Sequence, residues 1–224
     1  MNVGILLAAG ASSRMGRSKP LVRARGHSFL AHGLRHLWTT CDAVVVVLGS
    51  DAPAVRAQVE AEFGRRVRGG GLRSEPRSAR RPGARGLEAR FVVNRSWRRG
   101  MLGSARLGLK AALTMKPETL LVLPVDHPAV KPETVKALAE AMREALRAFR
   151  PGGANSPFAY ALVPRYRRRR GHPVALSPAL ARAIAADPRA HDLSDAVRRH
   201  ARLVGYLDCT DAGIVRNRNT PTRR

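Results

Sequence analysis

Short apolar runs alternate along the chain with longer segments in which apolar residues recur every three or four positions. The runs have the length of buried strands, and the longer segments have the period of an amphipathic helix. The expected strands are Val3–Ala8, Ala43–Leu48, Arg90–Val93, Leu120–Val125, Tyr160–Val163, Val174–Leu176 and Leu203–Leu207. The expected helices are Ser28–Thr39, Ala54–Phe63, Gly103–Thr114, Pro132–Phe149, Pro178–Ala186 and Leu193–Ala201. This alternation predicts βαβ units stacked on a largely parallel sheet, with Ser177 and Asp192 capping the last two helices.

Two charged segments interrupt the alternation. Residues 65–88 are rich in Gly, Arg, Ser and Pro and show no apolar period. Such a segment cannot bury a core, so we expect a mobile insertion within one domain that spans residues 1–224. A nucleic-acid-binding loop is the alternative for this segment. The second segment, Arg165–Arg170, holds five arginines in six residues. It is either a solvated turn or a clamp for an anionic acceptor.

Length and composition limit the class of protein. The chain has 224 residues, of which 44% are hydrophobic, so it can bury a core of its own. No apolar run approaches the roughly 18–20 residues of a membrane span, and the N-terminus lacks the features of a signal peptide. Cys41 and Cys209 have no metal-ligand spacing. We therefore expect a cytoplasmic protein with two free thiols and no membrane partner; its oligomeric state is left open.

The formal net charge is +25, from 41 Lys and Arg against 16 Asp and Glu. Such a charge favours polyanions, including nucleic acids, as partners. The arginines are spread along the chain, however, and only 4% of residues are aromatic, so platforms for stacking single-stranded bases are scarce. We expect nonspecific, salt-sensitive adhesion to polyanions rather than a dedicated nucleic-acid site.

The first strand leads into a loop of small residues that contains two cations. Small residues let the backbone approach a ligand closely, and successive N–H groups in such a loop bind anions. Five residues separate Gly10 from Gly16, which excludes the Walker pattern, and the dinucleotide pattern Gly-x-Gly-x-x-Gly is absent. The loop therefore indicates polyphosphate binding by another motif. The expected nucleotide contacts in it are Leu7, Ala8, Ala9, Gly10, Arg14 and Lys19.

A second candidate lies at the end of the apolar run Leu120–Val125. Asp126 follows it directly, at the edge where α/β sheets bind ligands. A buried carboxylate needs a positive partner, and Mg²⁺ takes one or two carboxylates together with phosphate oxygens. Asp126 is therefore a candidate metal ligand, with a helix-capping role as the alternative. For His127 we expect packing behind the site rather than metal ligation.

The loop resembles the signature of the molybdenum-cofactor nucleotidyltransferase-like family, the MobA-like NTP transferases. That signature reads Leu-Ala-(Ala/Gly)-Gly-x-Ser-x-Arg-Met-Gly-x-x-Lys, and each fixed position is present between Leu7 and Lys19. Three further motifs follow in family order, and the resemblance extends from Val3 to Pro221. It implies a three-layer, Rossmann-like α/β sandwich of the nucleotide-diphospho-sugar transferase type, with a mainly parallel sheet and one antiparallel strand.

The resemblance also implies roles for residues in these motifs. Asn219, in Asn-Arg-Asn-Thr-Pro, is the second Mg²⁺ ligand beside Asp126, although the acidic residue that usually follows the Pro is Thr222 here. Asn94, Gly100 and Ser104 are similar to the family's nucleotide contacts, with a well-packed helix start as the alternative for the last two. His172, in Gly-His-Pro-Val, lies on the acceptor side or is a core residue. The last motif is similar to the cytidylyltransferase branch.

The function implied is nucleotidyl transfer. A phosphorylated small molecule attacks the α-phosphorus of a nucleoside triphosphate, with CTP favoured, and pyrophosphate leaves. Arg14, Lys19 and Asp126 are the expected catalytic residues and Mg²⁺ the expected cofactor. A basic nucleic-acid-binding or regulatory protein on a catalytically decayed transferase scaffold is the alternative.

Overall fold

The structure, a computed structural model, describes residues 1–10, 18–63, 68–69, 88–149 and 158–218. Strands and helices alternate along the chain as the sequence pattern predicts. The helices are α1 (Phe29–Trp38), α2 (Ala52–Phe63), α3 (Met101–Leu113), α4 (Pro132–Ala148), α5 (Pro178–Ala186) and α6 (Leu193–His200). The strands are β1 (Asn2–Ala8), β2 (Arg23–Ala24), β3 (His27–Ser28), β4 (Ala43–Leu48), β5 (Arg68–Gly69), β6 (Glu88–Val93), β7 (Thr119–Pro124), β8 (Tyr160–Tyr166), β9 (Arg169–Arg170), β10 (Val174–Leu176) and β11 (Leu203–Asp208).

One large sheet forms the middle of the molecule. Its strand order is β11-β8-β10-β7-β1-β4-β6-β5, and β9 pairs with β8. β1 is parallel to both β4 and β7, whereas β10 is antiparallel to both β7 and β8. The expected sheet, mainly parallel with one antiparallel strand, is thus confirmed. The β8–β9 hairpin adds a short antiparallel pairing that the sequence pattern did not indicate.

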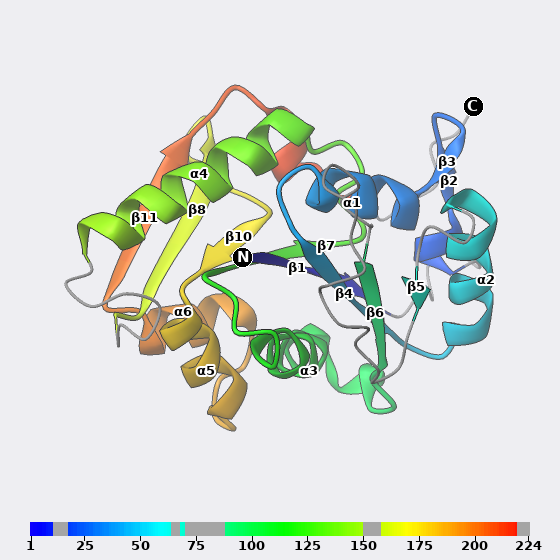
Figure 1. The fold of residues 1–224 in the computed structure, drawn as a ribbon, viewed down its shortest axis with the longest axis horizontal. Coiled ribbons are helices and arrows are strands. Elements are labelled where there is room, and N and C mark those ends of the chain that lie inside the picture. The colour runs from blue at the N-terminus through cyan, green and yellow to red at the C-terminus, as the bar shows by residue number, and fades with distance from the viewer. Residues whose placement is uncertain (11–17, 64–67, 70–87, 150–157, 219–224) are drawn as a thin grey trace, which may run out of the picture.

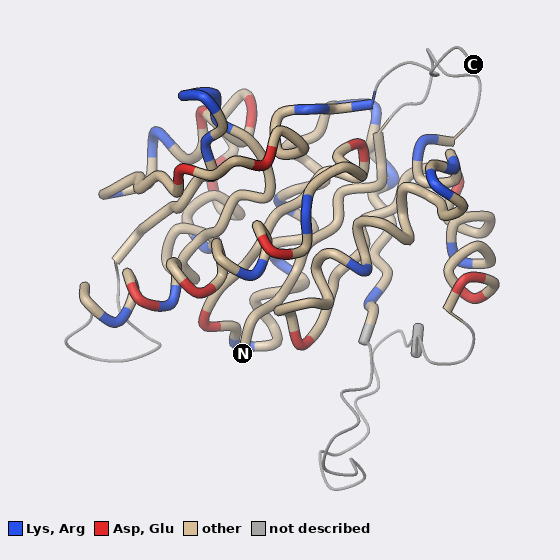
Figure 2. The backbone as a smooth tube through the Cα atoms, turned by 90° about the horizontal axis from the view of Figure 1, so that it is seen from above, with Lys and Arg blue, Asp and Glu red and all other residues tan. Residues whose placement is uncertain are grey.

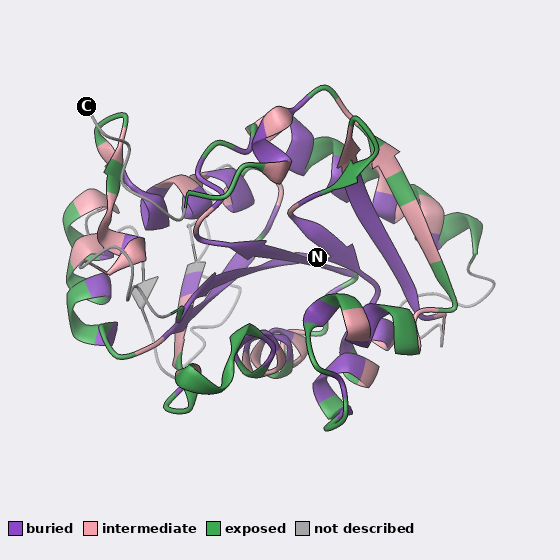
Figure 3. Ribbon diagram, turned by 180° about the vertical axis from the view of Figure 1, so that it is seen from behind, coloured by how far each residue is buried: buried purple, intermediate pink, exposed green. Residues whose placement is uncertain are grey.

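Helices cover both faces of this sheet, so the molecule has three layers (Figure 1). One layer contains α1, α2 and α4, and the other contains α3, α5 and α6. The central strands are buried on both faces, as Figure 3 shows, which explains why β1, β4 and β7 appear in the sequence as continuous apolar runs. Gly108 lets α3 approach the sheet, because a methyl group there would lie 2.6 Å from Ile5 Cγ2.

The strand directions identify the edge of the sheet at which a ligand site is expected. β1, β4, β6 and β7 run parallel, so their carboxyl ends share this edge. The segments that follow these strands begin at residues 9, 49, 94 and 125. The loop after β1, Asn94 and Asp126 therefore lie along one edge, where open α/β sheets bind ligands.

Several local predictions can be compared with the structure. The hydroxyl of Ser177 accepts a hydrogen bond from the N–H of Leu180, and Asp192 accepts one from Asp195, so both caps are confirmed. The predicted insertion 65–88 differs at its ends, since β5 lies inside it and pairs with the start of β6. Residues 64–67 and 70–87 lie outside the described residues, so the insertion itself stays a prediction.

The distribution of the basic residues and the state of the two cysteines agree with what the sequence predicts. Lys and Arg are distributed over several elements of the tube in Figure 2 rather than confined to one of them. Cys41 and Cys209 are free thiols, as expected. Burial raises the pKa of both, and Cys41 is the more deeply buried of the two. No helix among the described residues combines the length and apolarity needed to cross a membrane.

Candidate active site

Lys19 and Asp126 meet at the carboxyl edge of the sheet. Asp126 follows β7, and Lys19 opens a short 3₁₀ helix, Lys19–Leu21. The Nζ atom of Lys19 lies 3.5 Å from Oδ2 of Asp126, and the two side chains are 19% and 20% exposed. Lys19 is thus one positive partner of Asp126, and metal ligation by Asp126 stays a prediction. The 3.5 Å separation is at the outer limit of a hydrogen bond.

The backbone of the predicted phosphate loop begins at the end of β1. Leu7, Ala8 and Ala9 are buried, so the contribution expected from Leu7 is its backbone. Gly10 is exposed, and a methyl group there would have no neighbour within 4 Å. This open space is consistent with close approach of a ligand to the backbone. Arg14 lies outside the described residues, so its role stays a prediction.

Gly49 is a further feature of this edge that sequence reasoning missed. It follows β4 and lies against the start of the phosphate loop. A methyl group at Gly49 would be 2.9 Å from the carbonyl oxygen of Ala9, which is closer than such a contact allows. Gly49 therefore lets the end of β4 approach Ala9 closely. An apolar strand followed by Gly-Ser is the only sequence signal for it.

The C-terminal segment is anchored beside Asp126 by a second carboxylate, Asp211. Its Oδ2 accepts hydrogen bonds from the N–H of Lys131 at 2.8 Å and from the hydroxyl of Thr134 at 2.9 Å. Its Oδ1 accepts one from the N–H of Gly213 at 2.7 Å. Asp211 is 3% exposed. It therefore ties the start of α4 to the 3₁₀ helix Ala212–Val215, and sequence analysis missed it.

Close backbone contacts continue this attachment as far as Arg218. A methyl group at Gly213 would clash with the backbone of Ala129, so the segment lies directly on the loop that follows Asp126. The N–H of Arg218 donates a hydrogen bond of 2.8 Å to the carbonyl oxygen of Asp126. Asn219, the predicted second metal ligand, follows Arg218 but lies outside the described residues. Its role as a ligand stays a prediction.

Asn94 and Ser104 form a closed contact at the start of α3. The Asn94 side-chain amide donates to the Ser104 hydroxyl at 2.9 Å, and its oxygen accepts from the N–H of Ser96 at 2.9 Å. Both residues are buried, at 8% and 4% exposure. We expected these side chains to contact a nucleotide, but here they hold the turn between β6 and α3. Gly100 has a φ of 109° at the N-cap of α3, a conformation that favours glycine. Nucleotide contact by these three residues stays a prediction.

His172 and His127 pack together behind Asp126. Their ring centroids are 4.9 Å apart, and Nε2 of His127 lies 3.7 Å from Oδ1 of Asp126. Burial lowers the pKa of His127 and lowers that of His172 to about 3, where the neighbouring His127 adds to the effect. Both rings are therefore neutral at pH 7. The arrangement agrees with the expected packing role of His127 and leaves the acceptor role of His172 a prediction.

The Arg165–Arg170 run forms the β8–β9 hairpin, with Arg167 and Arg168 at its turn. Arg165 makes two hydrogen bonds to Asp208, of 2.9 and 2.7 Å, which raises its own pKa and lowers that of Asp208. The four arginines from Arg167 to Arg170 are exposed. The structure therefore places a solvated turn at the carboxyl end of β8, and the clamp interpretation stays a prediction.

The donor set at Asp126 can be compared with the needs of a metal ion. The described residues contain no group of three or more His, Cys, Asp and Glu side chains that could hold a metal by themselves. One partly exposed carboxylate is nevertheless what Mg²⁺ uses when phosphate oxygens and water complete its shell. Asp126 therefore fits a cation that arrives with a nucleotide, and does not fit a closed structural metal site.

Comparisons with known proteins agree with this fold. The model of the MobA-like NTP transferase domain matches residues 4–203. A nicotine blue oxidoreductase from Paenarthrobacter nicotinovorans is 32% identical over 214 residues, which cover 93% of this chain and 87% of that protein.

Two solved structures share the architecture at low identity. A nucleotidyl transferase from Methanothermobacter has a TM-score of 0.67 and 18% identity, with 98% of this chain and 92% of that chain covered. A manganese complex of a Mycobacterium tuberculosis protein has a TM-score of 0.57 and 20% identity, with 93% and 88% covered. Since the family match extends over most of the chain and the fold agrees with it, the protein belongs to the MobA-like NTP transferase domain family, and its domain is a nucleotidyltransferase domain.

Proposed function

We propose that the protein transfers a nucleotidyl group from a nucleoside triphosphate to a phosphorylated small molecule and releases pyrophosphate. The observation that carries the proposal is the meeting of Lys19 and Asp126, which lie 107 residues apart in the sequence, at the carboxyl edge of the sheet. A cation for polyphosphate and a carboxylate for a metal ion are the two charges that this reaction needs. The family match supports the reaction class.

The proposed chemistry needs no strong general base. The acceptor phosphate is ionised at neutral pH and attacks the α-phosphorus in line, while the bond from that phosphorus to the leaving pyrophosphate breaks. Lys19, Arg14 and the N–H groups of the loop from Ala8 to Gly10 neutralise the charge that develops on pyrophosphate. A Mg²⁺ ion held by Asp126 and Asn219 supplies charge neutralisation at the α-phosphate.

Lys19 has two successive partners in this proposal. In the structure it balances the charge of Asp126 at 3.5 Å. When a triphosphate binds, Lys19 would turn from Asp126 to the phosphate oxygens, which would leave Asp126 to hold the accompanying cation. The Lys19–Asp126 contact thus keeps a partly buried carboxylate paired until substrate arrives, which avoids the cost of an uncompensated charge.

The finer assignments rest on the sequence motifs. CTP is the favoured nucleotide because Leu-Ala-Ala-Gly and Gly-His-Pro-Val resemble the cytidylyltransferase branch, and His172 is the proposed contact on the acceptor side. A role in molybdenum cofactor biosynthesis would fit this branch. We also propose a cytoplasmic location, since both thiols are free.

The experiment is a pyrophosphate-release assay with each of the four triphosphates, a panel of phosphorylated acceptors, and Mg²⁺ or Mn²⁺. We expect release with one triphosphate, CTP first, that requires both acceptor and metal. The absence of release in every combination, with triphosphate binding also absent, would contradict the proposal and favour the regulatory alternative.

A second candidate function comes from the relative named as an oxidoreductase. Nicotinamide dinucleotides carry a pyrophosphate, so the same loop could bind one even though the dinucleotide pattern is absent. A parallel assay measures oxidation of NADH and NADPH with dye acceptors. Metal-independent oxidation without pyrophosphate release would favour this function over nucleotidyl transfer.

A further inference from the structure

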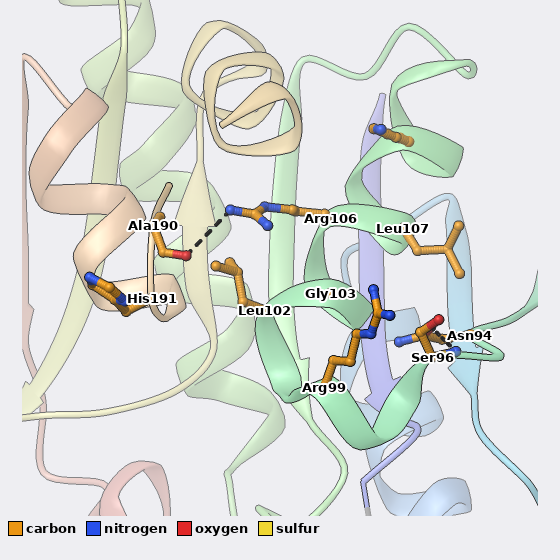
Figure 4. Close-up of a pocket in the computed structure, with 10 residues that line it drawn as sticks. Asn94, Ser96, Arg99, Leu102, Gly103, Arg106, Leu107, Ala190 and His191 are labelled. Atoms are coloured by element: carbon orange, nitrogen blue, oxygen red, sulfur yellow. Dashed lines mark hydrogen bonds between the residues drawn. The ribbon is translucent and has the colours of Figure 1, made fainter. Parts of the chain in front are cut away.

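A cationic cavity lies along the outer face of α3, away from Lys19 and Asp126. Its volume is about 440 Å³, and it extends from the β6–α3 turn to the connection between α5 and α6 (Figure 4). Leu102 and Leu107 give it an apolar portion. Neither Lys19 nor Asp126 lines it, although Asn94, one of the predicted nucleotide contacts, lies at one end of it.

Three cationic side chains and the ring of His191 line this cavity. Arg106 and Lys110 lie one turn apart on α3, Arg99 ends the 3₁₀ helix Trp97–Arg99 that precedes it, and His191 belongs to the α5–α6 connection. Among the described residues that line the cavity there is no acidic one. Asp195, the carboxylate beside His191, is already engaged by the backbone N–H of His191 and by Arg198. The cavity therefore presents positive charge without a carboxylate to balance it.

Arg106 is the most constrained of these cations. Its Nη2 atom reaches the carbonyl oxygen of Ala190 at 3.4 Å, close to the limit for a hydrogen bond. Its Nε atom is buried and has no hydrogen-bond partner within the described part of the chain. A buried guanidinium nitrogen without a partner is unfavourable, and an oxyanion is the group that guanidinium binds best. Arg106 is half-buried and lines the cavity, so its guanidinium group is available to an anion bound there.

Gly103 in the cavity lining is a second observation, because it keeps room for a ligand. It lies inside α3, where glycine is less favourable than alanine. A methyl group there would meet only the Asn94 side-chain nitrogen, at 3.8 Å, so packing does not require glycine. Gly108 in the same helix differs, because a methyl group there would clash with Ile5 and Val47. Gly103 instead leaves this part of the cavity lining open.

We propose that this cavity binds the phosphate group of a small phosphorylated molecule other than the nucleoside triphosphate. The basic side chains fit the phosphate, and Leu102 and Leu107 fit an apolar body attached to it. The inference stands on the cavity alone and does not depend on the proposed transferase reaction.

The test is calorimetric titration with phenyl phosphate, which combines one phosphate with an apolar ring. We expect Arg106→Gln to weaken binding about tenfold or more, because it removes a charge-assisted contact. Arg182→Gln, which removes an equal charge from an exposed position on α5, should leave binding unchanged. Gly103→Leu should abolish binding by filling the cavity, whereas Gly103→Ala should retain it. Equal binding by Arg106→Gln and Arg182→Gln would overturn the proposal.

Two further titrations separate this site from the active site. Phenyl phosphate should bind Lys19→Ala as tightly as it binds the wild-type protein. It should also bind in the presence of saturating CTP and Mg²⁺. Loss of binding in either titration would place the phosphate in the nucleotide site and overturn the proposal. Thermal unfolding of each variant verifies that the substitutions leave the protein folded.

Discussion

Asp126 and Asp211 lie on two sides of the same loop, and their surroundings are opposite. Asp126 is 20% exposed, and the Lys19 ammonium lies 3.5 Å from it. Asp211 is 3% exposed and accepts three hydrogen bonds of 2.7 to 2.9 Å from Lys131, Thr134 and Gly213. Asp126 is partly exposed and makes a long ionic contact, whereas Asp211 is buried and joins two segments. The difference fits the proposed division between a carboxylate used in chemistry and one that positions the loop.

The pair also shows how the fold builds an active site from distant segments. Asp211 fastens the C-terminal segment to the start of α4, and seven residues later the N–H of Arg218 contacts Asp126. Asn219 comes next in the chain. The anchoring carboxylate therefore holds the described part of the C-terminal segment beside Asp126.

The largest expected effect is loss of stability in Asp211→Ala. Removing this carboxylate leaves buried donors without an acceptor, which should lower the free energy of unfolding by about 2–5 kcal/mol. Asp208→Ala is the matched control, because it removes a carboxylate whose bonds to Arg165 are exposed, and its loss should be much smaller. Urea unfolding measures both. Equal losses in the two variants would show that Asp211 is no anchor.

The pH dependence of the free energy of unfolding tests a second buried group, the His36 ring, whose pKa Asp211 influences. His36 is 8% exposed, and burial lowers its pKa from 6.5 to about 4, an effect that His32 increases and Asp211 opposes. Below pH 6.5 the unfolded chain binds a proton that the folded chain does not, so stability falls between pH 6.5 and 4. His36→Leu should remove roughly 3 kcal/mol of that fall. Urea unfolding at pH 7 and pH 4 measures the difference; an unchanged pH dependence would contradict the burial argument.

Variants of Lys19 and Arg14 test whether the loop beside Asp126 binds triphosphate. Lys19→Ala and Arg14→Ala should each weaken triphosphate binding by about 1.5–3 kcal/mol, because each removes a charge-assisted phosphate contact. Lys136→Ala removes the same charge from an exposed position on α4 and serves as the control. Calorimetric titration with CTP and Mg²⁺ gives the affinities. Unchanged affinity and turnover in both variants would disprove the phosphate-loop assignment.

The smallest effect on catalysis should come from the predicted insertion. A short Gly/Ser linker in place of residues 70–87 keeps the β5–β6 pairing and should leave turnover close to the wild-type value. It should reduce the salt dependence of DNA or RNA binding, because fewer phosphate contacts release fewer counterions. Lost turnover with unchanged polyanion binding would instead assign the segment to the active site.

Most of the sheet could be predicted from the sequence because its central strands are buried on both faces. β1, β4 and β7 therefore appear as unbroken apolar runs. The two-residue strands β2, β3, β5 and β9 carry no such pattern, since their pairing is fixed by tertiary contacts and turns. Arg167 and Arg168, for example, have φ angles of 48° and 65° in the β8–β9 turn, where no glycine marks a turn in the sequence.

Residues of the candidate site could be predicted from the sequence only where they belong to a local motif. Asp126 could be found because it ends an apolar strand, and Lys19 because it closes a loop motif. Asp211 bonds to Gly213 two residues on, a local turn that Asp-Ala-Gly permits. Its bonds to Lys131 and Thr134 span 80 and 77 residues and have no signal in a single sequence. Asn94 differs, because its motif suggested a ligand contact, which stays a prediction, while its bonds to Ser96 and Ser104 had no signal in the sequence.

The central claim is that Asp126 serves chemistry and Asp211 serves structure. The most direct measurement is Mg²⁺-dependent pyrophosphate release by Asp126→Asn, with its urea unfolding measured on the same preparation. We predict a loss of turnover of about 100-fold or more, at a free energy of unfolding close to that of the wild-type protein. Turnover within about twofold of wild type, across Mg²⁺ concentrations, would show that Asp126 is structural and contradict the account.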